Sequence, residues 1–239
     1  MLKSKIYAFL SVPIFALLYL HTAMIVLLCF PCATIGQKNC IRKLVHLWAI
    51  AAFWILGKRL SVEGVDLINK NEKYILLVNH TSLFDIMAVM SVFPGVSWFG
   101  REYLQQIPLF GYILKMIDYI PMRTGDLKNT KSMISRMIKN SQNMTVAIFP
   151  EGTRTTTGQL NRFRKGFIHV MRASELSILP VTLNGFYELK PKTRFHIDFS
   201  SRLQVVIHNP IEFDVLKKKN DIDIITQVKD VIQSRLLYS

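Results

Sequence analysis

The stretch that decides the fold is Lys73–Asp85, which reads KYILLVNHTSLFD. Its first part, Tyr74–Val78, is apolar and partly β-branched, which predicts a buried strand. The strand stops at Asn79, and the short polar side chains that follow can cap the start of a helix. We therefore expect a helix over Leu83–Val92 and place His80 in a strand-to-helix turn, where open α/β sheets bind their ligands.

The spacing between His80 and Asp85 carries candidate chemistry. Inside one helix, residues five apart point about 140° from each other, so their side chains meet only if His80 lies before the helix. There the carboxylate can accept the proton of one ring nitrogen and leave the other nitrogen free as a base. The competing interpretation is structural: Ser82 and Asp85 form a capping box, and His80 is a polar turn residue.

Composition points to an anionic partner at a membrane. The chain has 239 residues, room for one α/β domain and a short appendage, and its 30 Lys+Arg against 16 Asp+Glu give a net charge of +14. Such a balance favours nucleic acid, an acidic membrane surface or phosphorylated substrates. No zinc-finger spacing or aromatic RNA-binding signature supports nucleic acid, and half of the residues are apolar, most densely near the amino end.

Two apolar segments open the chain. Ile6–Phe30 contains no charged residue and, as a helix of about 37 Å, is long enough to cross a bilayer. Lys3 and Lys5 precede it, as in a signal peptide, but no small-x-small cleavage site follows, so we expect it to be retained. Leu44–Gly57 is short for a span. Because basic residues flank both segments, we predict a helical hairpin dipping into one leaflet from the cytosol. The alternative is a single span by the first segment.

All three cysteines lie in or beside this apolar region. Cys29, Cys32 and Cys40 form an odd set, and with His46 they could be written as four zinc ligands. Packing roles fit better, because two of the four would lie at the end of a lipid-facing run. We expect no metal and no disulfide.

From Lys58 onward, short β-like runs alternate with helical ones, which predicts an α/β domain with a mixed, mainly parallel sheet flanked by helices. We divide the chain into a membrane-associated helical hairpin, residues 1–57, and an α/β domain, residues 58–239. The predicted strands are Arg59–Val62, Tyr74–Val78, Val96–Phe99, Asp118–Pro121, Thr145–Phe149, Ile178–Leu183, Phe195–Ser200 and Leu203–His208. The predicted helices are Leu83–Val92, Arg101–Met116, Leu127–Ser141, Lys165–Ala173 and Ile222–Leu237.

A second polar stretch, PEGTRT, follows the predicted strand Thr145–Phe149. Gly152 lets the backbone approach a ligand closely, and Thr153 offers a hydroxyl group. Arg154 offers a planar guanidinium that matches phosphate oxygens. More basic residues and a predicted helix start follow, which add anion affinity. A solvated basic loop is the alternative interpretation.

Together, the motifs resemble a known family. NHTSLFD, the arginine of DYIPMR, FPEGTRT and ILPVTLNG are similar, in order and spacing over about residues 60–215, to the four motifs of the glycerolipid acyltransferases. His-x4-Asp alone is a weak signal, whereas FPEGTR some seventy residues later is a strong one. The short chain with its amino-terminal helix pair is most similar to the bacterial type that acylates lysophosphatidic acid.

The resemblance implies roles for individual residues. His80 would be the general base on the acceptor hydroxyl, and Asp85 would orient it. Pro180 would shape the acyl-donor side. The acceptor phosphate region would be held by Arg123, Glu151, Gly152, Thr153 and Arg154. Because a carboxylate repels phosphate, we expect Glu151 to order the arginines. Pro121 and Met122 before Arg123, and Thr155 where serine is common, depart from the family pattern.

The implied reaction transfers an acyl chain from acyl-CoA or acyl carrier protein to lysophosphatidic acid, making phosphatidic acid without a metal, cofactor or covalent acyl-enzyme. The implied setting is the inner membrane, with the site on the cytosolic face among membrane phospholipids. Apolar residues in Trp98–Met116 either line an acyl groove or form a plain core helix. Two alternatives remain: another acceptor, such as glycerol-3-phosphate or a different lysolipid, or a non-catalytic basic lipid-binding membrane protein.

Overall fold

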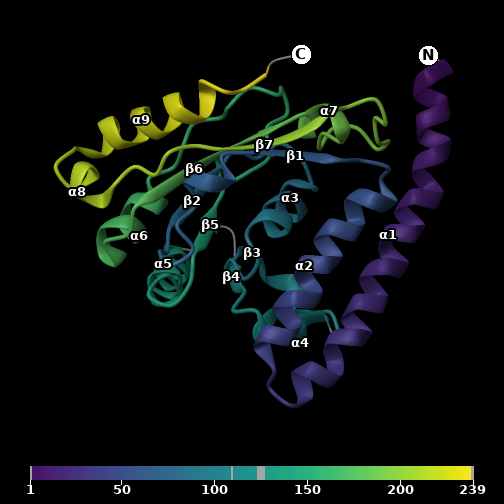
Figure 1. Ribbon diagram of the computed structural model, residues 1–239, viewed down its shortest axis with the longest axis horizontal. Coiled ribbons are helices and arrows are strands. Elements are labelled where there is room, and N and C mark those ends of the chain that lie inside the picture. The colour runs from purple at the N-terminus through teal and green to yellow at the C-terminus, as the bar shows by residue number, and fades with distance from the viewer. Residues whose placement is uncertain (1, 109, 123–126, 238–239) are drawn as a thin grey trace.

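A mixed five-stranded sheet organises the chain (Figure 1). The computed structural model describes residues 2–108, 110–122 and 127–237. The strand order is β1 (Leu60–Glu63), β7 (Leu203–Ile207), β6 (Ile178–Asn184), β2 (Ile75–Val78) and β5 (Val146–Ile148). Neighbours run parallel except β6 and β7. The predicted α/β fold with a mixed, mainly parallel sheet is therefore confirmed.

Strand β2 is the strand predicted within Tyr74–Val78, and it divides the core into two layers. All four of its residues are buried, as expected for a parallel strand covered on both faces. Leu76 and Val78 face a cluster that includes α3 (Asp85–Val92) and the end of α2 (Lys38–Ile55). Ile75 and Leu77 face the opposite cluster. That cluster is built from α5 (Leu127–Ser141), α6 (Gly166–Ser174) and α9 (Asp221–Gln233).

The segment between α3 and α5 departs from prediction. A helix expected over Arg101–Met116 is instead a 3-10 turn, Glu102–Gln106, followed by α4 (Phe110–Met116). Pro108 explains the break, because proline lacks the N–H that a continuous helix needs. Around it, β3 (Phe99–Arg101) and β4 (Ile120–Met122) form a parallel pair, and Ser97 joins this pair to β5 through a bridge to Val146.

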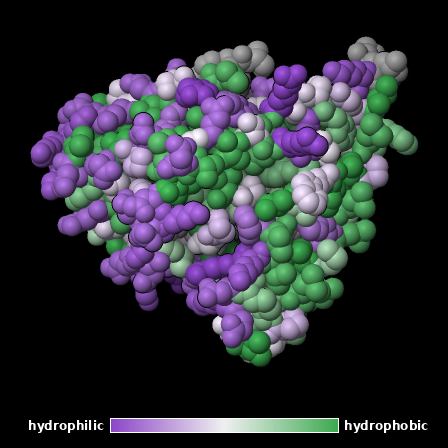
Figure 2. All heavy atoms as spheres, in the orientation of Figure 1, coloured by the Kyte–Doolittle hydropathy of each residue, from purple (hydrophilic) through white to green (hydrophobic). Residues whose placement is uncertain are grey.

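Helices α1 (Leu2–Thr34) and α2 pack as a hairpin beside the sheet (Figure 1). The indole N–H of Trp48 on α2 donates to Thr22 Oγ1 on α1 at 3.0 Å. Among the described residues, one helix, Lys3–Thr34, is long and apolar enough to cross a membrane. Its apolar surface (Figure 2) indicates membrane association and includes the exposed side chains Phe9, Val12, Leu17, Tyr19, Leu20, Met24, Leu27 and Leu28.

The predicted strand Phe195–Ser200 is wrong, because this segment covers α1 instead of joining the sheet. Phe199 meets Tyr7 edge-on at 5.5 Å between ring centroids, and the amide of Ile197 donates to Ser11 Oγ at 2.8 Å. Asp198 Oδ1 accepts from the amide of Ser200 at 2.8 Å, which makes a local turn. The remaining short elements are a 3-10 turn at Val65–Leu67, α7 (Phe186–Leu189) and α8 (Phe213–Leu216).

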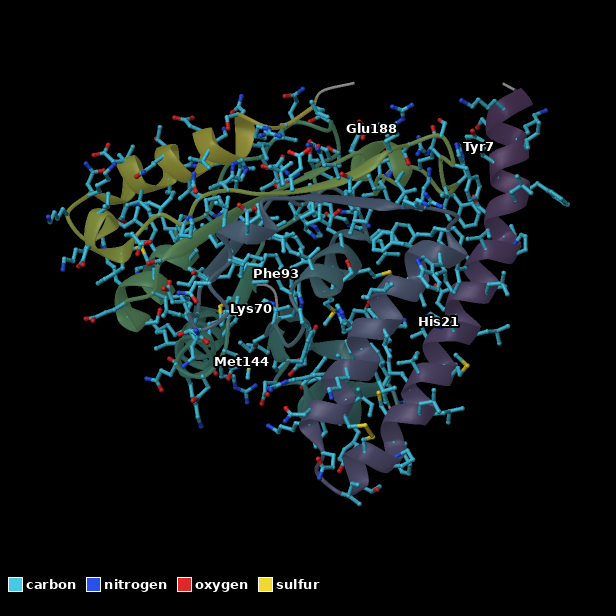
Figure 3. All side chains as sticks on the ribbon, in the orientation of Figure 1. Tyr7, His21, Lys70, Phe93, Met144 and Glu188 are labelled. Atoms are coloured by element: carbon cyan, nitrogen blue, oxygen red, sulfur yellow. A yellow bond between two sulfur atoms is a disulfide. The ribbon has the colours of Figure 1, made fainter. Side chains whose placement is uncertain are left out.

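The expectation of no disulfide is also wrong. Cys32 and Cys40 are joined by a disulfide near the tip of the hairpin, visible as a yellow bond in Figure 3. Cys29 is free and buried, in line with a packing role. The helical hairpin brings the two cysteines together across its short turn, a pairing that the residue spacing alone did not reveal.

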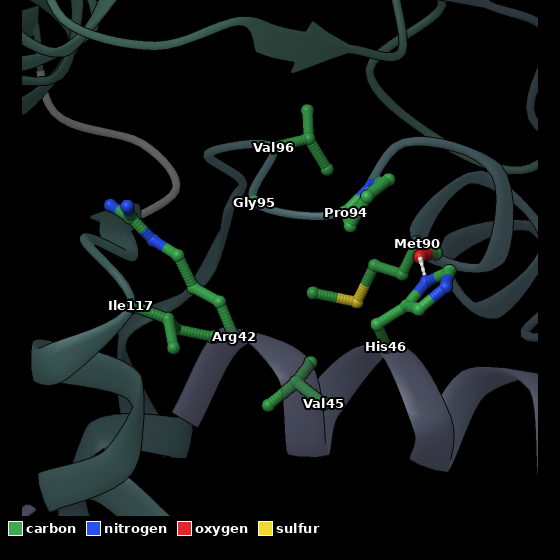
Figure 4. Close-up of a pocket in the computed structure, with 8 residues that line it drawn as sticks. All are labelled: Arg42, Val45, His46, Met90, Pro94, Gly95, Val96 and Ile117. Carbon is green, nitrogen blue, oxygen red and sulfur yellow. Dashed lines mark hydrogen bonds between the residues drawn. The ribbon is translucent and has the colours of Figure 1, made fainter. Parts of the chain in front are cut away.

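Polar contacts fix α2 to the α/β layers. Lys38 and Arg42 both pair with Asp118, each at 3.0 Å. His46 Nδ1 lies 3.0 Å from the carbonyl oxygen of Met90 on α3, at the edge of a small hollow (Figure 4). None of the predicted site residues that the structure describes lines this hollow, which lies at the junction between the hairpin and the α/β layers.

Candidate active site

His80 and Asp85 meet where β2 ends and α3 begins. His80 lies in the turn and Asp85 is the first residue of α3, so the helix does not hold their side chains apart. His80 Nδ1 lies 2.9 Å from Asp85 Oδ2. The Asp85 side chain is fully buried, whereas that of His80 is 17% exposed. The pair therefore has a buried anchor and an accessible ring.

The surroundings of Asp85 settle which ring nitrogen carries the proton. Oδ2 also accepts from the amides of Thr81, at 2.6 Å, and Ser82, at 2.8 Å. A carboxylate so bonded acts only as an acceptor, so His80 Nδ1 must donate to it and Nε2 carries the free lone pair. The two interpretations of this stretch thus coincide, because Asp85 caps the turn and orients His80 at the same time.

Glu151 is bound to backbone and not to arginine. Its Oε1 accepts from the amide of His80 at 2.7 Å, and its Oε2 accepts from the amide of Asn161 at 2.8 Å. Burial raises the pKa of Glu151, although the two N–H donors oppose this rise. Among the described residues no ion pair joins Glu151 to Arg154, so the expectation that it orders the arginines fails for Arg154.

The loop after β5 is fastened to the same turn. The amide of Thr155 donates to the carbonyl oxygen of His80 at 2.9 Å, which places Arg154 next to the turn that carries His80. Gly152 adopts φ +71°, and a Cβ there would lie 2.8 Å from Arg164 Nε. Thr153 is exposed on this loop. The turn carrying His80 and the loop carrying Gly152, Thr153 and Arg154 therefore adjoin at one edge of the sheet.

Positive charge gathers around Arg154. Burial lowers the pKa of Lys190, and repulsion from Arg154 and Arg194 lowers it further. Lys190 is itself bound to the turn that carries His80, because Ser82 Oγ donates to its carbonyl oxygen at 2.8 Å. Within residues 2–108, 110–122 and 127–237, no carboxylate lies within ion-pair distance of Arg154 or Lys190. Such a cluster suits an anionic ligand.

One predicted site residue, Pro180, is not brought into this arrangement. Pro180 is buried inside β6, opposite Leu77 in the register, about 10 Å before His80 along the strand direction. Its role on the acyl-donor side stays a prediction. Arg123 lies outside the described residues. Asn79, expected to cap the helix, instead bonds the backbone of Leu183 on β6 through both ends of its amide.

One aromatic contact was missed. Phe149, at the end of β5, stacks on the imidazole of His80 with ring centroids 3.8 Å apart and an interplanar angle of 12°. Trp98 lies behind it at 5.2 Å between centroids. An apolar residue ending a buried strand carries no sequence signal for such a contact, because the contact depends on how β2 and β5 pair.

Two further histidines, His21 and His208, have ordinary partners. His21 Nε2 lies 3.2 Å from the carbonyl oxygen of Trp48, and His208 Nε2 lies 2.8 Å from Thr182 Oγ1. In the described part of the chain, no three or more His, Cys, Asp or Glu side chains gather in a way that could hold a metal ion.

Comparison with known proteins identifies the family. A model of the family described as Acyltransferase matches residues 59–184, which is more than half of the chain and includes His80, Asp85, Glu151 and Arg154. The chain belongs to the acyltransferase family. Within the matched segment of this acyltransferase lie both halves of the site, the His80–Asp85 pair and the loop with Arg154.

Individual relatives agree. A 1-acyl-sn-glycerol-3-phosphate acyltransferase of Cocos nucifera is 32% identical over 182 residues, covering 74% of this chain and 56% of that one. The alpha form from Homo sapiens is 27% identical over 186 residues, covering 75% and 64%. The acyltransferase chain thus spans roughly half to two thirds of the length of such relatives.

A solved structure shares the fold. The 1-acyl-sn-glycerophosphate (LPA) acyltransferase PlsC from Thermotoga maritima superposes with a TM-score of 0.77 at 20% identity, over 98% of this chain and 99% of that one. The likeness extends across the hairpin as well as the α/β layers, so the acyltransferase has the PlsC fold throughout.

Proposed function

We propose that this acyltransferase moves an acyl chain from acyl-CoA or acyl carrier protein to the free hydroxyl of lysophosphatidic acid, making phosphatidic acid. The observation that carries the proposal is the attachment of the Arg154 loop to the His80 turn, through the Thr155 amide at 2.9 Å and Glu151 Oε1 at 2.7 Å. His80, as a base with a free nitrogen, would then lie near Arg154 and Lys190, which have no carboxylate partner among the described residues, and a phosphorylated alcohol would use both the base and the cations.

The chemistry needs little beyond these groups. The acceptor hydroxyl oxygen attacks the thioester carbonyl carbon, while His80 Nε2 takes the hydroxyl proton. The resulting oxyanion collapses, the C–S bond breaks, and the imidazolium returns its proton to the thiolate. Asp85 holds the ring and stabilises its positive charge. Because the thioester is already activated, positioning the two substrates supplies much of the acceleration.

Cationic groups would position the acceptor. Arg154 and Lys190 are neighbours without a carboxylate partner among the described residues, so a phosphate would relieve their mutual repulsion. Fixing the phosphate a few ångströms from Nε2 also orients the hydroxyl. The substrates are amphipathic, which explains a site attached to the apolar α1–α2 hairpin. We place residues 1–57 in the inner membrane and the α/β domain, residues 58–239, on its cytosolic face.

The test is the product formed by the purified protein in phospholipid vesicles with a labelled acyl thioester. The rate of acyl transfer should be higher with lysophosphatidic acid as the acceptor than with glycerol-3-phosphate, other lysolipids or monoacylglycerol. A preference for another phosphorylated acceptor would change the proposed substrate but not the proposed chemistry. If His80→Ala leaves the rate unchanged, the catalytic proposal is wrong. Retained lipid binding without acyl transfer in that variant would exclude a purely lipid-binding function.

A further inference from the structure

The ring of His80 is held by two contacts of different kinds. The Asp85 carboxylate bonds Nδ1 at its edge, and the flat face of Phe149 covers one side of the ring at 3.8 Å. Phe149 is only 8% exposed, and Trp98 behind it only 3%, so the aromatic pair forms a fixed wall. The wall belongs to β5 and the segment bridged to it, whereas Asp85 belongs to α3.

Neither contact alone fixes the base. A single hydrogen bond at Nδ1 allows the imidazole to swing, because the hydrogen-bond angle tolerates tens of degrees. A near-parallel stack of 12° sets the plane of the ring but not its rotation within that plane. Together they fix the direction of Nε2, the atom that must meet the acceptor hydroxyl.

The stack also acts on charge. As the base takes a proton it becomes an imidazolium, and a cation over an aromatic face is attracted by the negative π-cloud. A buried aromatic wall gives this attraction without admitting water, which would screen it. The neutral imidazole gains less, so the contact strengthens as the proton moves. Only an interaction of that kind lowers the barrier.

We propose that Phe149 is a positioning residue for acyl transfer: its ring sets the plane of the His80 imidazole and stabilises the imidazolium formed when the acceptor hydroxyl is deprotonated. This role rests on the proposed function of His80 as the base. Phe149 would be a third member of the site beside His80 and Asp85, and its side chain carries no polar atom.

Graded fluorination tests the charge effect without changing the packing. Phe149 is replaced in the full-length protein by mono-, tri- and pentafluorophenylalanine, which progressively weaken and then reverse the negative face. We expect kcat to fall stepwise, by about 2- to 5-fold or more at full fluorination. The acid limb of the pH–rate profile should move to lower pH by roughly half a unit, because the protonated ring loses support. The titration of the acceptor's phosphate group is the same in every sample, so it cannot cause a difference between the variants.

Substitutions test the positioning effect. Phe149→Leu should lower kcat more than it changes the KM values, and it should shift the acid limb of the pH–rate profile as fluorination does. Phe149→Tyr keeps an aromatic face against His80, so it should restore both kcat and the position of the acid limb. The matched control is Phe93→Leu (Figure 3): Phe93 is also 8% exposed in the same cluster, yet no ring contact joins it to His80. It should lower the melting temperature and leave the acid limb in place.

An unmoved acid limb across the fluorinated series would overturn the proposal, even if Phe149→Leu loses activity or fails to fold. A shift in Phe93→Leu equal to that in Phe149→Leu would overturn it too. NMR titration of the His80 ring, identified by difference from His80→Ala, measures the same shift without any substrate. If no acceptor is acylated by the unmodified protein, the proposed function fails, while this titration still decides the role of the stack.

Discussion

Glu151 holds His80 by the backbone: its Oε1 lies 2.7 Å from the amide nitrogen of the histidine, and its Oε2 reaches the amide of Asn161 at 2.8 Å. A buried carboxylate in the PEGTRT stretch thus holds the turn that carries His80. It joins the loop after β5 to the turn after β2, so each half of the site depends on the other for its position.

Glu151→Gln should therefore damage catalysis more than acceptor binding. Glutamine keeps one acceptor oxygen but presents an NH₂ group to the second N–H, which leaves a buried donor unpaired at about 1–3 kcal/mol. We expect a lower melting temperature and a kcat reduced roughly 10- to 100-fold, with the KM for lysophosphatidic acid nearly unchanged. Steady-state kinetics measure this, and Glu175→Gln, at an exposed helix end, is the control. A rise in KM alone would instead mean that Glu151 contacts the acceptor.

Asp85→Asn should abolish most of the activity while preserving the fold. An Asn oxygen in the place of Oδ2 can still accept from the amides of Thr81 and Ser82 and from His80 Nδ1, so the tautomer of His80 is kept. The substitution removes the negative charge that stabilises the imidazolium formed during the reaction. We expect kcat to fall roughly 10²- to 10⁴-fold. Kinetics with a matched circular-dichroism spectrum check this, and an active variant would mean that the reaction does not need the negative charge of Asp85.

Arg154→Ala should mainly raise the KM for a phosphorylated acceptor. The guanidinium has no carboxylate partner among the described residues, so its loss removes a charge-assisted contact to phosphate worth about 1.5–3 kcal/mol, or roughly 10- to 100-fold in KM. Arg172→Ala is the control, because that side chain pairs with Asp221 on α9 at 2.8 Å. If Arg154→Ala changes neither KM nor kcat, the phosphate site lies elsewhere.

Gly152→Ala should destabilise the protein through the backbone. At φ +71° an alanine costs about 1–2 kcal/mol, and its Cβ would also displace Arg164, whose Nε would lie 2.8 Å away. Denaturant unfolding measures the loss. The matched change is Gly166→Ala at the start of α6, where nothing lies within 4 Å and no positive φ is involved. That variant should be neutral or slightly stabilising, and equal losses in both would refute the backbone argument.

Local pattern predicted much of this structure. The apolar run ending at Val78 marked β2, and α5 has the predicted bounds, Leu127–Ser141, because its apolar residues recur at helical spacing. The contact between His80 and Asp85 also followed from local geometry, since both residues lie on one turn.

Contacts between distant segments could not be predicted from the sequence. Glu151 was expected to face arginine, but its partners are backbone amides, which carry no side-chain signal in a sequence. The stack of Phe149 on His80 requires the pairing of β2 with β5. The β-like pattern of Phe195–Ser200 arises because this segment packs on α1, whereas the pattern alone predicts pairing with a strand of the sheet. Apart from Asn161, which is ten residues from Glu151, these partners lie more than sixty residues away in the sequence.

Acid should destabilise the protein through His208, on the far side of the sheet from the hairpin. Thr182 Oγ1 donates to the carbonyl oxygen of Ile232, so His208 Nε2 must donate to that hydroxyl oxygen, and the neutral ring fits. Burial, and then repulsion from Arg235, lowers the pKa of His208 from 6.5 to about 4. Between these values the unfolded chain binds a proton that the folded one does not, so stability falls as the pH drops from about 6.5 to about 4.

His208→Gln removes this proton uptake, so its melting temperature should depend less on pH across that window than the melting temperature of the unmodified protein. Above pH 7 the variant should be no more stable than the parent, because glutamine replaces a neutral ring that was already well bonded. Thermal unfolding in a series of buffers measures both effects. His169→Gln, at an exposed position on α6, should leave the acid dependence as it was. If the two variants lose stability in acid equally, another group controls the transition, because only His208 carries the buried contact to Thr182.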